Sequence, residues 1–217
     1  MATVTGLPEH HVAHHFDSAE QEFDSAKTGM WLFMASEIMM FGALFVGALL
    51  FHTLHHGGFA EGSAHLDWRF GAVNTFFLLT AGLTMGLAVV SAQAGEQGKV
   101  RMNLILSLVF AAGFLVVKSL EYAQKFEHGT LPGRLWHAHH GFSDPFAHVF
   151  FGLYFVMTGL HAVHVLVGMG LMIFALVRSS RVQFSRSYFT PIEMVAIYWA
   201  LVDLVWVFLF PLLYLIR

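Results

Sequence analysis

The 217-residue chain is 57% hydrophobic and only 12% charged, with a formal net charge of −3. Soluble domains average about 25% charged residues, so this composition predicts one all-α integral membrane domain without a soluble domain. The acidic balance gives no reason to expect a nucleic-acid partner. The sequence has no cysteine, which excludes disulfides, an iron–sulfur cluster and a thiolate copper site.

Residues 1–17 are polar and rich in histidine, and we expect a disordered tail in front of a single membrane domain over 18–217. Adventitious metal binding by these histidines is the alternative. The first 28 residues have no apolar core, so we expect no cleavable signal peptide. Ser18 followed by Gln21 has the spacing of a capping box, which predicts a short interfacial helix that runs into the first span.

Five low-charge segments follow, and about 20 apolar residues are enough to cross a bilayer. The fold class predicted is therefore an all-α bundle of five transmembrane helices with a short N-terminal interfacial helix. The spans are expected at about 29–51, 71–94, 102–122, 146–177 and 192–215.

Two proline motifs mark helix starts. Asp144 before Pro145 predicts the start of the fourth span, with proline at the first helical position. Thr190, Pro191 and Glu193 combine an early proline with a capping box at the start of the fifth.

The basic residues only slightly favour one orientation. With the N-terminus inside, six of the eleven Lys and Arg residues are inside and five outside, so we expect a cytoplasmic N-terminus and an external C-terminus. The longer connections 52–70 and 123–144 would then face outward. Their eight histidines share no ligand spacing, and we interpret them as solvated loop residues rather than a metal site: His52, His55, His56, His65, His128, His137, His139 and His140.

Four ionisable residues lie within the predicted spans and could carry chemistry. Glu37 is in the first span, where a carboxylate is costly unless it faces protein, water or a partner. His161 and His164 are three residues apart, so we expect them to share a helix face, as metal or haem ligands or as hydrogen-bonded helix contacts. No nearby carboxylate or thiolate completes a ligand set, so we expect no metal. Asp203 is either a buried hydrogen-bonding acid or part of a proton path.

Other polar residues are expected to be structural, and none is expected to be catalytic. Lys118 and Glu121 are spaced for a helical salt bridge near a membrane surface. Asn74, Thr75 and Thr80 are expected to form interhelical hydrogen bonds.

Five segments, in order along the chain, carry a resemblance to a known family. They are GMWLFMASEIMMFGALF around Glu37, NTFFLLTAG at 74–82, VKSLEY at 117–122, FVMTGLHAVHVLVG at 155–168 and EMVAIYWALVDLVWVFLFPLLYLI at 193–216. Together they resemble subunit III of the haem–copper cytochrome c oxidases.

The resemblance implies a non-redox subunit of a bacterial inner-membrane complex that reduces oxygen and pumps protons. It implies direct packing against subunit I, with subunit II in the same complex. Haems and copper are expected in those partner subunits and none in this chain, while bound phospholipid is expected.

By position, Glu37 matches the family's buried, carbodiimide-reactive glutamate. His161 and His164 match its paired histidines, and Glu193 and Asp203 match the acids of its last helix. Two departures matter. Ala200 occupies a position where the family usually has histidine. Five spans are predicted where mitochondrial-type members have seven, so the lipid-holding cleft built with the two missing helices must be absent or completed by another subunit.

Several alternatives remain open from the sequence. Within the same class, the chain could belong to a quinol oxidase or be an accessory protein of nitric oxide reductase. An independent proton channel or transporter could use the intramembrane acids and histidines as a relay, although no broken-helix signal is visible. An enzyme with its own redox centre would need more intramembrane ligands than this sequence has.

The depth of Glu37 in the membrane predicts which ionisable groups lie near it. At a rise of 1.5 Å per residue it lies roughly 12 Å from Gly29, while Asp203 lies roughly 15 Å from Glu193. His164 lies roughly 21 Å from Arg178 on the same scale and fits less well. We expect Glu37 to face other helices, protonated or hydrogen-bonded, with Asp203 and His164 as the nearest ionisable groups.

Overall fold

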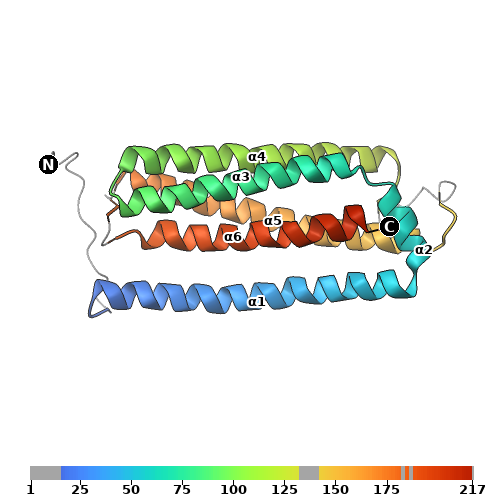
Figure 1. Ribbon diagram of the computed structural model, residues 1–217, viewed down its shortest axis with the longest axis horizontal. Helices are drawn as coiled ribbons and strands as arrows, with labels where there is room; N and C mark the ends of the chain where they lie inside the picture. The colour runs from blue at the N-terminus through green and yellow to red at the C-terminus, as the bar shows by residue number, and fades with distance from the viewer. Residues whose placement is uncertain (1–15, 132–141, 182–183, 186–187, 217) are drawn as a thin grey trace.

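A computed structural model describes residues 16–131, 142–181, 184–185 and 188–216. In this part of the chain the structure is helical, and the long helices lie side by side as a bundle (Figure 1). Five helices are long and apolar enough to cross a membrane, which confirms the predicted fold class. The helices are α1 (Ala19–Leu54), α2 (His56–Ala64), α3 (Trp68–Gln93), α4 (Gln97–Glu127), α5 (Ala147–Ser179) and α6 (Thr190–Phe210), followed by a π-helical turn, η2 (Pro211–Leu215).

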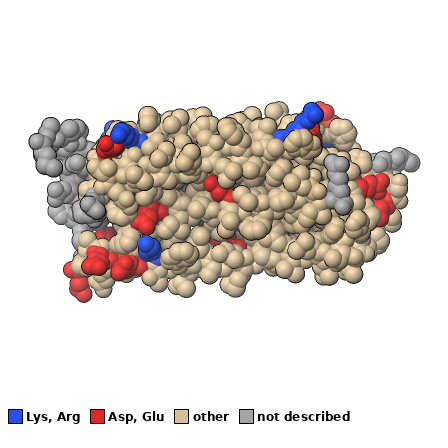
Figure 2. Space-filling view, viewed as in Figure 1, with Lys and Arg blue, Asp and Glu red and all other residues tan. Residues whose placement is uncertain are grey.

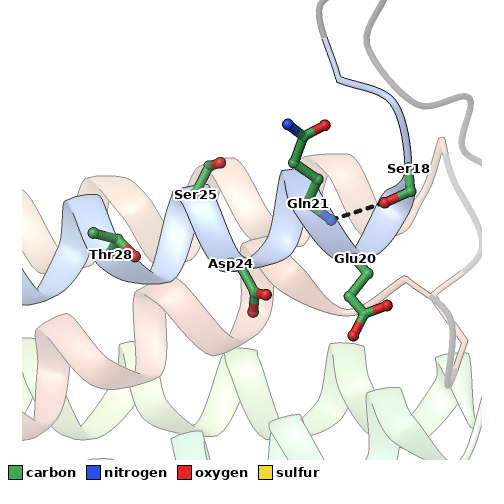
Figure 3. Close-up of a pocket in the computed structure, with 6 residues that line it drawn as sticks. All are labelled: Ser18, Glu20, Gln21, Asp24, Ser25 and Thr28. Carbon is green, nitrogen blue, oxygen red and sulfur yellow. Dashed lines mark hydrogen bonds between the residues drawn. The ribbon is translucent and has the colours of Figure 1, made fainter.

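The predicted interfacial helix forms the first turns of α1. Ser18 Oγ accepts a hydrogen bond from the backbone N–H of Gln21 at 3.1 Å (Figure 3). Gln21 Oε1 accepts one from Asp17 N–H at 2.6 Å. The first turns are polar, with Glu20 and Asp24 on one side and Ser25 on the other (Figure 3). The helix continues unbroken into the apolar span. The tail predicted for residues 1–17 lies almost wholly outside the described residues.

The two proline-marked helix starts differ from their predictions in detail. α5 begins at Ala147 rather than Pro145, and Asp144 caps the preceding turn by accepting a hydrogen bond from Phe146 N–H at 2.8 Å. α6 begins at Thr190 with proline in its first turn, but Phe189 is the N-cap residue and supplies no side-chain hydrogen bond. The predicted capping box is therefore wrong.

The connection predicted as a loop over 52–70 contains α2, which packs on the start of α5. Phe59 is fully buried, and its ring lies 5.0 Å from that of Phe150. Gly62 meets the Phe150 ring so closely that a Cβ would collide with it. Glu61 adds a polar tie, because its carboxylate accepts backbone N–H groups of Ser143 at 2.7 Å and Asp144 at 2.9 Å.

Some histidines of this connection pack on rings instead of being solvated. The His55 ring stacks on Phe146 at 3.9 Å, and the His52 ring lies 4.9 Å from those of His56 and Phe59. The expectation of solvated loop residues was wrong for His52, which lies in α1, and for His55, which joins α1 to α2; both are partly buried, whereas His56 is exposed. His137, His139 and His140 lie outside the described residues.

Burial is uneven across the bundle. The most apolar window of the last span is 56% buried, but that of α1 is only 17% buried. Figure 1 shows α1 along one edge of the bundle, and its neighbours are α6, α2 and part of α5. Charged side chains gather at the two ends of the visible face, apart from acidic atoms at mid-length (Figure 2). The long apolar middle is the part that suits a bilayer.

Candidate functional site

Glu37 and His164 meet between α1 and α5, near the middle of each helix. Glu37 Oε2 lies 3.0 Å from His164 Nε2, and the two side chains are 15% and 14% exposed. The ring of Phe41 lies 5.2 Å from the imidazole at a steep angle. The hydroxyl of Tyr198 on α6 donates to the backbone carbonyl of His164 at 3.1 Å. Three helices therefore hold this pair.

The hydrogen bonds of His164 limit where protons can be. Its Nδ1 lies 2.8 Å from the carbonyl of Leu160, and a carbonyl only accepts, so Nδ1 carries a proton. Nε2 then faces Glu37 with a single proton between them. The pair is either a neutral carboxyl that donates to a neutral imidazole or a carboxylate that accepts from an imidazolium. Its net charge is zero in both states, which lowers the cost of placing it in a membrane.

His161 turns away from this pair. It is fully buried between the rings of Phe114, at 5.5 Å, and Trp206, at 5.2 Å, and neither ring nitrogen has a hydrogen-bond partner among the described residues. The two histidines share no site, because a step of three residues still leaves them about 60° apart around the helix. The described residues include no group of three or more His, Cys, Asp or Glu that could hold a metal.

Asp203 lies against α3, and Glu37 takes His164 as its partner instead. A Cβ on Gly82 would collide with Asp203 Oδ2, so the carboxyl group approaches the α3 backbone directly. Asp203 Oδ1 is buried and has no hydrogen-bond partner among the described residues. The second carboxyl expected beside Glu37 is thus replaced by an imidazole.

Glu193 links the first turns of α6 to α1. Its carboxylate lies 3.5 Å from Lys27 Nζ, and the two side chains are 19% and 41% exposed. An exposed pair of this kind contributes about 0–1 kcal/mol. This contact helps to position the loosely packed α1 but offers no chemistry of its own.

Lys118 and Glu121 on α4 form the predicted helical salt bridge, and both side chains are almost fully buried within the bundle, with exposed fractions of 3% and 2%. Lys118 Nζ donates to Glu121 Oε2 at 3.0 Å, to Tyr154 Oη at 3.0 Å and to Tyr214 Oη at 2.8 Å. Both tyrosine hydroxyls donate to Glu121 Oε1, at 2.7 and 2.6 Å. All three ammonium donors are used, and both carboxylate oxygens accept.

Sequence reasoning missed both tyrosines of this cluster. Tyr154 comes from α5 and Tyr214 from the π-helical turn, which begins at Pro211. The available signal was a Lys–Glu pair in an apolar segment, because buried charges require hydrogen-bonding neighbours. That signal indicates that hydrogen-bonding side chains must surround the pair, but it does not indicate which segments supply them.

The remaining polar residues, which were expected to form interhelical hydrogen bonds, differ in the hydrogen bonds that they make. Thr75 Oγ1 accepts a hydrogen bond from Trp206 Nε1 at 3.0 Å, so it links α3 to α6. Thr80 donates to the carbonyl of Phe76 in its own helix and links nothing. Asn74 is fully buried, and its side-chain atoms have no partner among the described residues.

The fold and these contacts define a multi-pass membrane protein whose ionisable groups are largely paired within a five-span bundle. The family model of cytochrome c oxidase subunit III matches residues 11–216. The chain therefore belongs to this family, as a subunit III of a haem–copper oxidase that works in partnership with other oxidase subunits.

Named relatives agree with this assignment and cover nearly the whole chain. Cytochrome c oxidase subunit 3 of Corynebacterium diphtheriae is 31% identical over 194 residues, which is 87% of each chain. The probable quinol oxidase subunit 3 of Staphylococcus haemolyticus is 26% identical over 95% of this chain and 96% of the relative. The corresponding Staphylococcus epidermidis protein is 28% identical over the same shares.

Proposed function

We propose that this chain is the non-redox subunit III of a proton-pumping terminal oxidase in the cytoplasmic membrane of a bacterium. It packs directly against subunit I, with subunit II in the same complex, and supports proton uptake and the stability of the complex. Haems and copper belong to those partners. The N-terminus is cytoplasmic and the C-terminus external. Family membership supports the assignment, and the Glu37–His164 pair supports the role in proton uptake.

The pair is suited to hold a proton at mid-membrane depth. Because Nδ1 of His164 donates to the Leu160 carbonyl, the proton shared by the pair lies along the 3.0 Å line between Nε2 and Glu37 Oε2 and can move from one atom to the other. The move changes neither the net charge nor the number of hydrogen bonds. The neutral-carboxyl state is also the form with which a hydrophobic carbodiimide reacts. The competing function is purely structural, with the pair as a fixed link between α1 and α5.

Replacing Glu37 by Gln tests this role. The amide can still donate to His164, so we expect the complex to assemble with an unchanged haem spectrum. Proton uptake should fall, and turnover should decay sooner, because the amide cannot exchange a proton. Glu20→Gln, in the polar first turns of α1, is the matched control and should change neither. Unchanged turnover and pumping in Glu37→Gln would leave only the structural role.

The absence of a redox centre is tested on the purified chain itself. We expect less than stoichiometric haem or copper by absorbance and elemental analysis, because the described residues provide no cluster of ligands. Stoichiometric haem or tightly bound copper in the isolated chain would overturn the assignment as a non-redox subunit.

The electron donor is cytochrome c or a quinol. The staphylococcal relatives favour the quinol, because they are named probable quinol oxidase subunits and match 95% of this chain. The relative from Corynebacterium favours cytochrome c. Oxygen uptake by the purified complex with each donor in turn distinguishes the two.

A phospholipid chain fits one face of the bundle. A hollow of about 210 Å³ lies between α1 and α6 and is lined by apolar side chains only: Ile38, Phe41, Phe45, Leu201, Val205 and Phe208 among them. Acyl chains suit such a surface, and a lipid here would cover part of the poorly buried α1. Native mass spectrometry of the complex should retain lipid, and substitution of Gly42 by Trp in this hollow should reduce it.

A further inference from the structure

A second groove, of about 460 Å³, lies between α3 and α6 and differs from the lipid-suited hollow in chemistry. Small residues line both helices, with Gly82 and Gly86 on α3 and Ala196 and Ala200 on α6. Small residues let a further helix approach closely in a membrane. They do not by themselves identify a binding site, so the polar groups of the groove decide what it takes.

Two polar groups in this groove lack partners within the described residues. Asp203 Oδ1 is buried without a hydrogen bond. Trp199, only 1% exposed, has a buried indole Nε1 without an acceptor, and its neighbouring Cδ1 is 3.9 Å from the Cβ position of Gly82, so this edge of the ring faces the groove. A buried polar group without a partner costs about 1–3 kcal/mol. The groove therefore has both a donor and an acceptor to satisfy.

The depth of Asp203 limits what can satisfy it. It is the fourteenth residue of the 26-residue span Thr190–Leu215, so it lies near the middle of the membrane. Lipid headgroups do not reach this depth, and an acyl chain neither donates nor accepts a hydrogen bond. Intramembrane acids generally face protein or a water-filled cavity. A polar side chain on a neighbouring helix meets the requirement.

We propose that the groove between α3 and α6 binds a transmembrane helix of another oxidase subunit, and that this helix places a hydrogen-bond donor against Asp203. The side chain that enters carries N–H or O–H groups, and one that also accepts can bond the Trp199 indole. This proposal rests on the proposed function, because it takes the partner from the same oxidase. Gly82 is part of the recognition, because any Cβ there would displace the carboxyl group.

Photo-crosslinking in native membranes tests the proposal without disturbing Asp203. A photoreactive phenylalanine analogue replaces Leu83, which lines the groove and is 65% exposed. The matched control replaces Val109, which is 59% exposed on α4 and lies at a similar depth outside the groove. We expect an oxidase subunit to be crosslinked from Leu83 and lipid from Val109. Lipid alone, or a second copy of this chain, from Leu83 would overturn the proposal.

Two substitutions then test the hydrogen bond. Asp203→Asn keeps an acceptor, whereas Asp203→Leu removes it at similar size. Interhelical hydrogen bonds in membranes correspond to roughly threefold to thirtyfold in association. We expect Asp203→Leu to lower the fraction of partner retained in detergent by such a factor, and Asp203→Asn by less. Equal retention of wild type and Asp203→Leu would refute a role for Asp203. If the unmodified chain co-purifies with no oxidase subunit, the proposed function fails, independently of the groove.

Discussion

The buried cluster around Lys118 shows how this bundle tolerates charge at the residue scale. The ammonium group donates to one carboxylate oxygen and two phenols, while the other carboxylate oxygen of Glu121 accepts from both phenols. The rings of Tyr154 and Trp206 lie 4.7 and 5.4 Å from Nζ and add cation–π attraction. The cluster is neutral overall if the lysine and glutamate are charged. It joins α4, α5 and the end of the last span.

Removing one charge from this cluster should cost more than removing both. Lys118→Met leaves Glu121 buried and unpaired, and the free energy of unfolding should fall by about 3–5 kcal/mol. The double substitution of Lys118 and Glu121 by Met should recover much of this loss, because no buried charge remains. Thermal melting of the purified complex in detergent measures both. A double variant as unstable as the sum of the two single variants would show that the charges are not coupled.

Which residues meet could be predicted only in part. The charges of Glu37, Lys118 and Asp203 are visible in apolar segments, so their importance followed from the sequence. The sequence named Glu121 as the partner of Lys118 and His164 as one of two candidates for Glu37, but it did not decide between His164 and Asp203, because Glu37 and His164 are separated by 127 positions. Contact between them depends on the tilt and rotation of two helices, which hydrophobic periodicity does not fix. Depths in the membrane, calculated from a rise of 1.5 Å per residue, even favoured Asp203 over His164 as the neighbour of Glu37.

At the scale of elements, α5 packs closely on α6 at one glycine. A Cβ on Gly168 would lie 2.8 Å from Trp199 Cε3 and 3.2 Å from Tyr198 Cε1. Gly168→Ala should therefore push the helices apart and lower the melting temperature of the complex, at a cost of about 1–3 kcal/mol. Gly170→Ala in the same helix is the matched control, because nothing lies within 4 Å of its Cβ position. Equal melting temperatures for the two variants would contradict this packing.

The tie between α2 and α5 should depend on pH. Backbone N–H groups of Ser143 and Asp144 hold the pKa of the Glu61 carboxyl below its ordinary value of 4.5. Since the folded pKa is depressed, the tie is intact above pH 4.5 and is lost as the pH falls through the lowered value. The protection of the Ser143 and Asp144 amides, measured as the exchange rate relative to the intrinsic rate at the same pH, should then fall on acidification. In Glu61→Gln the protection should be lower and should not show this titration.

The prediction of helices succeeded for the long apolar segments and failed for α2, whose formation depends on packing against another helix. The five spans follow from length and charge, and the structure places helices over all of them. α2 was missed because HGGFAEGSA has two glycines at its start and no capping side chain. Its stability comes from the packing of Phe59 and Gly62 on α5, which no local pattern shows.

At the scale of the whole molecule, α1 is the least enclosed helix. Only 17% of its most apolar window is buried. The Glu37–His164 pair and the Lys27–Glu193 pair join it to the rest of the bundle, alongside packing on α6. A helix with so much apolar surface needs lipid or protein around it.

The charge argument for the orientation of the molecule becomes stronger once buried residues are removed from the count. Lys118 is 3% exposed and bonded within the bundle, so it does not contribute to the surface charge of the outer side. The excess of Lys and Arg at the proposed cytoplasmic end then becomes six against four, which strengthens the positive-inside argument. Figure 1 shows α1 starting at one end of the bundle and η2 ending at the other, as an odd number of spans requires.

Reporter fusions provide the measurement. A reporter active only in the cytoplasm should be active when joined before Phe16 and inactive when joined after Ile216, and a reporter active only outside should show the reverse. Activity of one reporter at both ends would refute the five-span topology. The two reporters exchanging sides would keep five spans but reverse the orientation. Substituting Lys99 and Arg101 by Gln, at the proposed inner end, should make the orientation less uniform, whereas Lys118→Gln should leave it unchanged because that residue is buried.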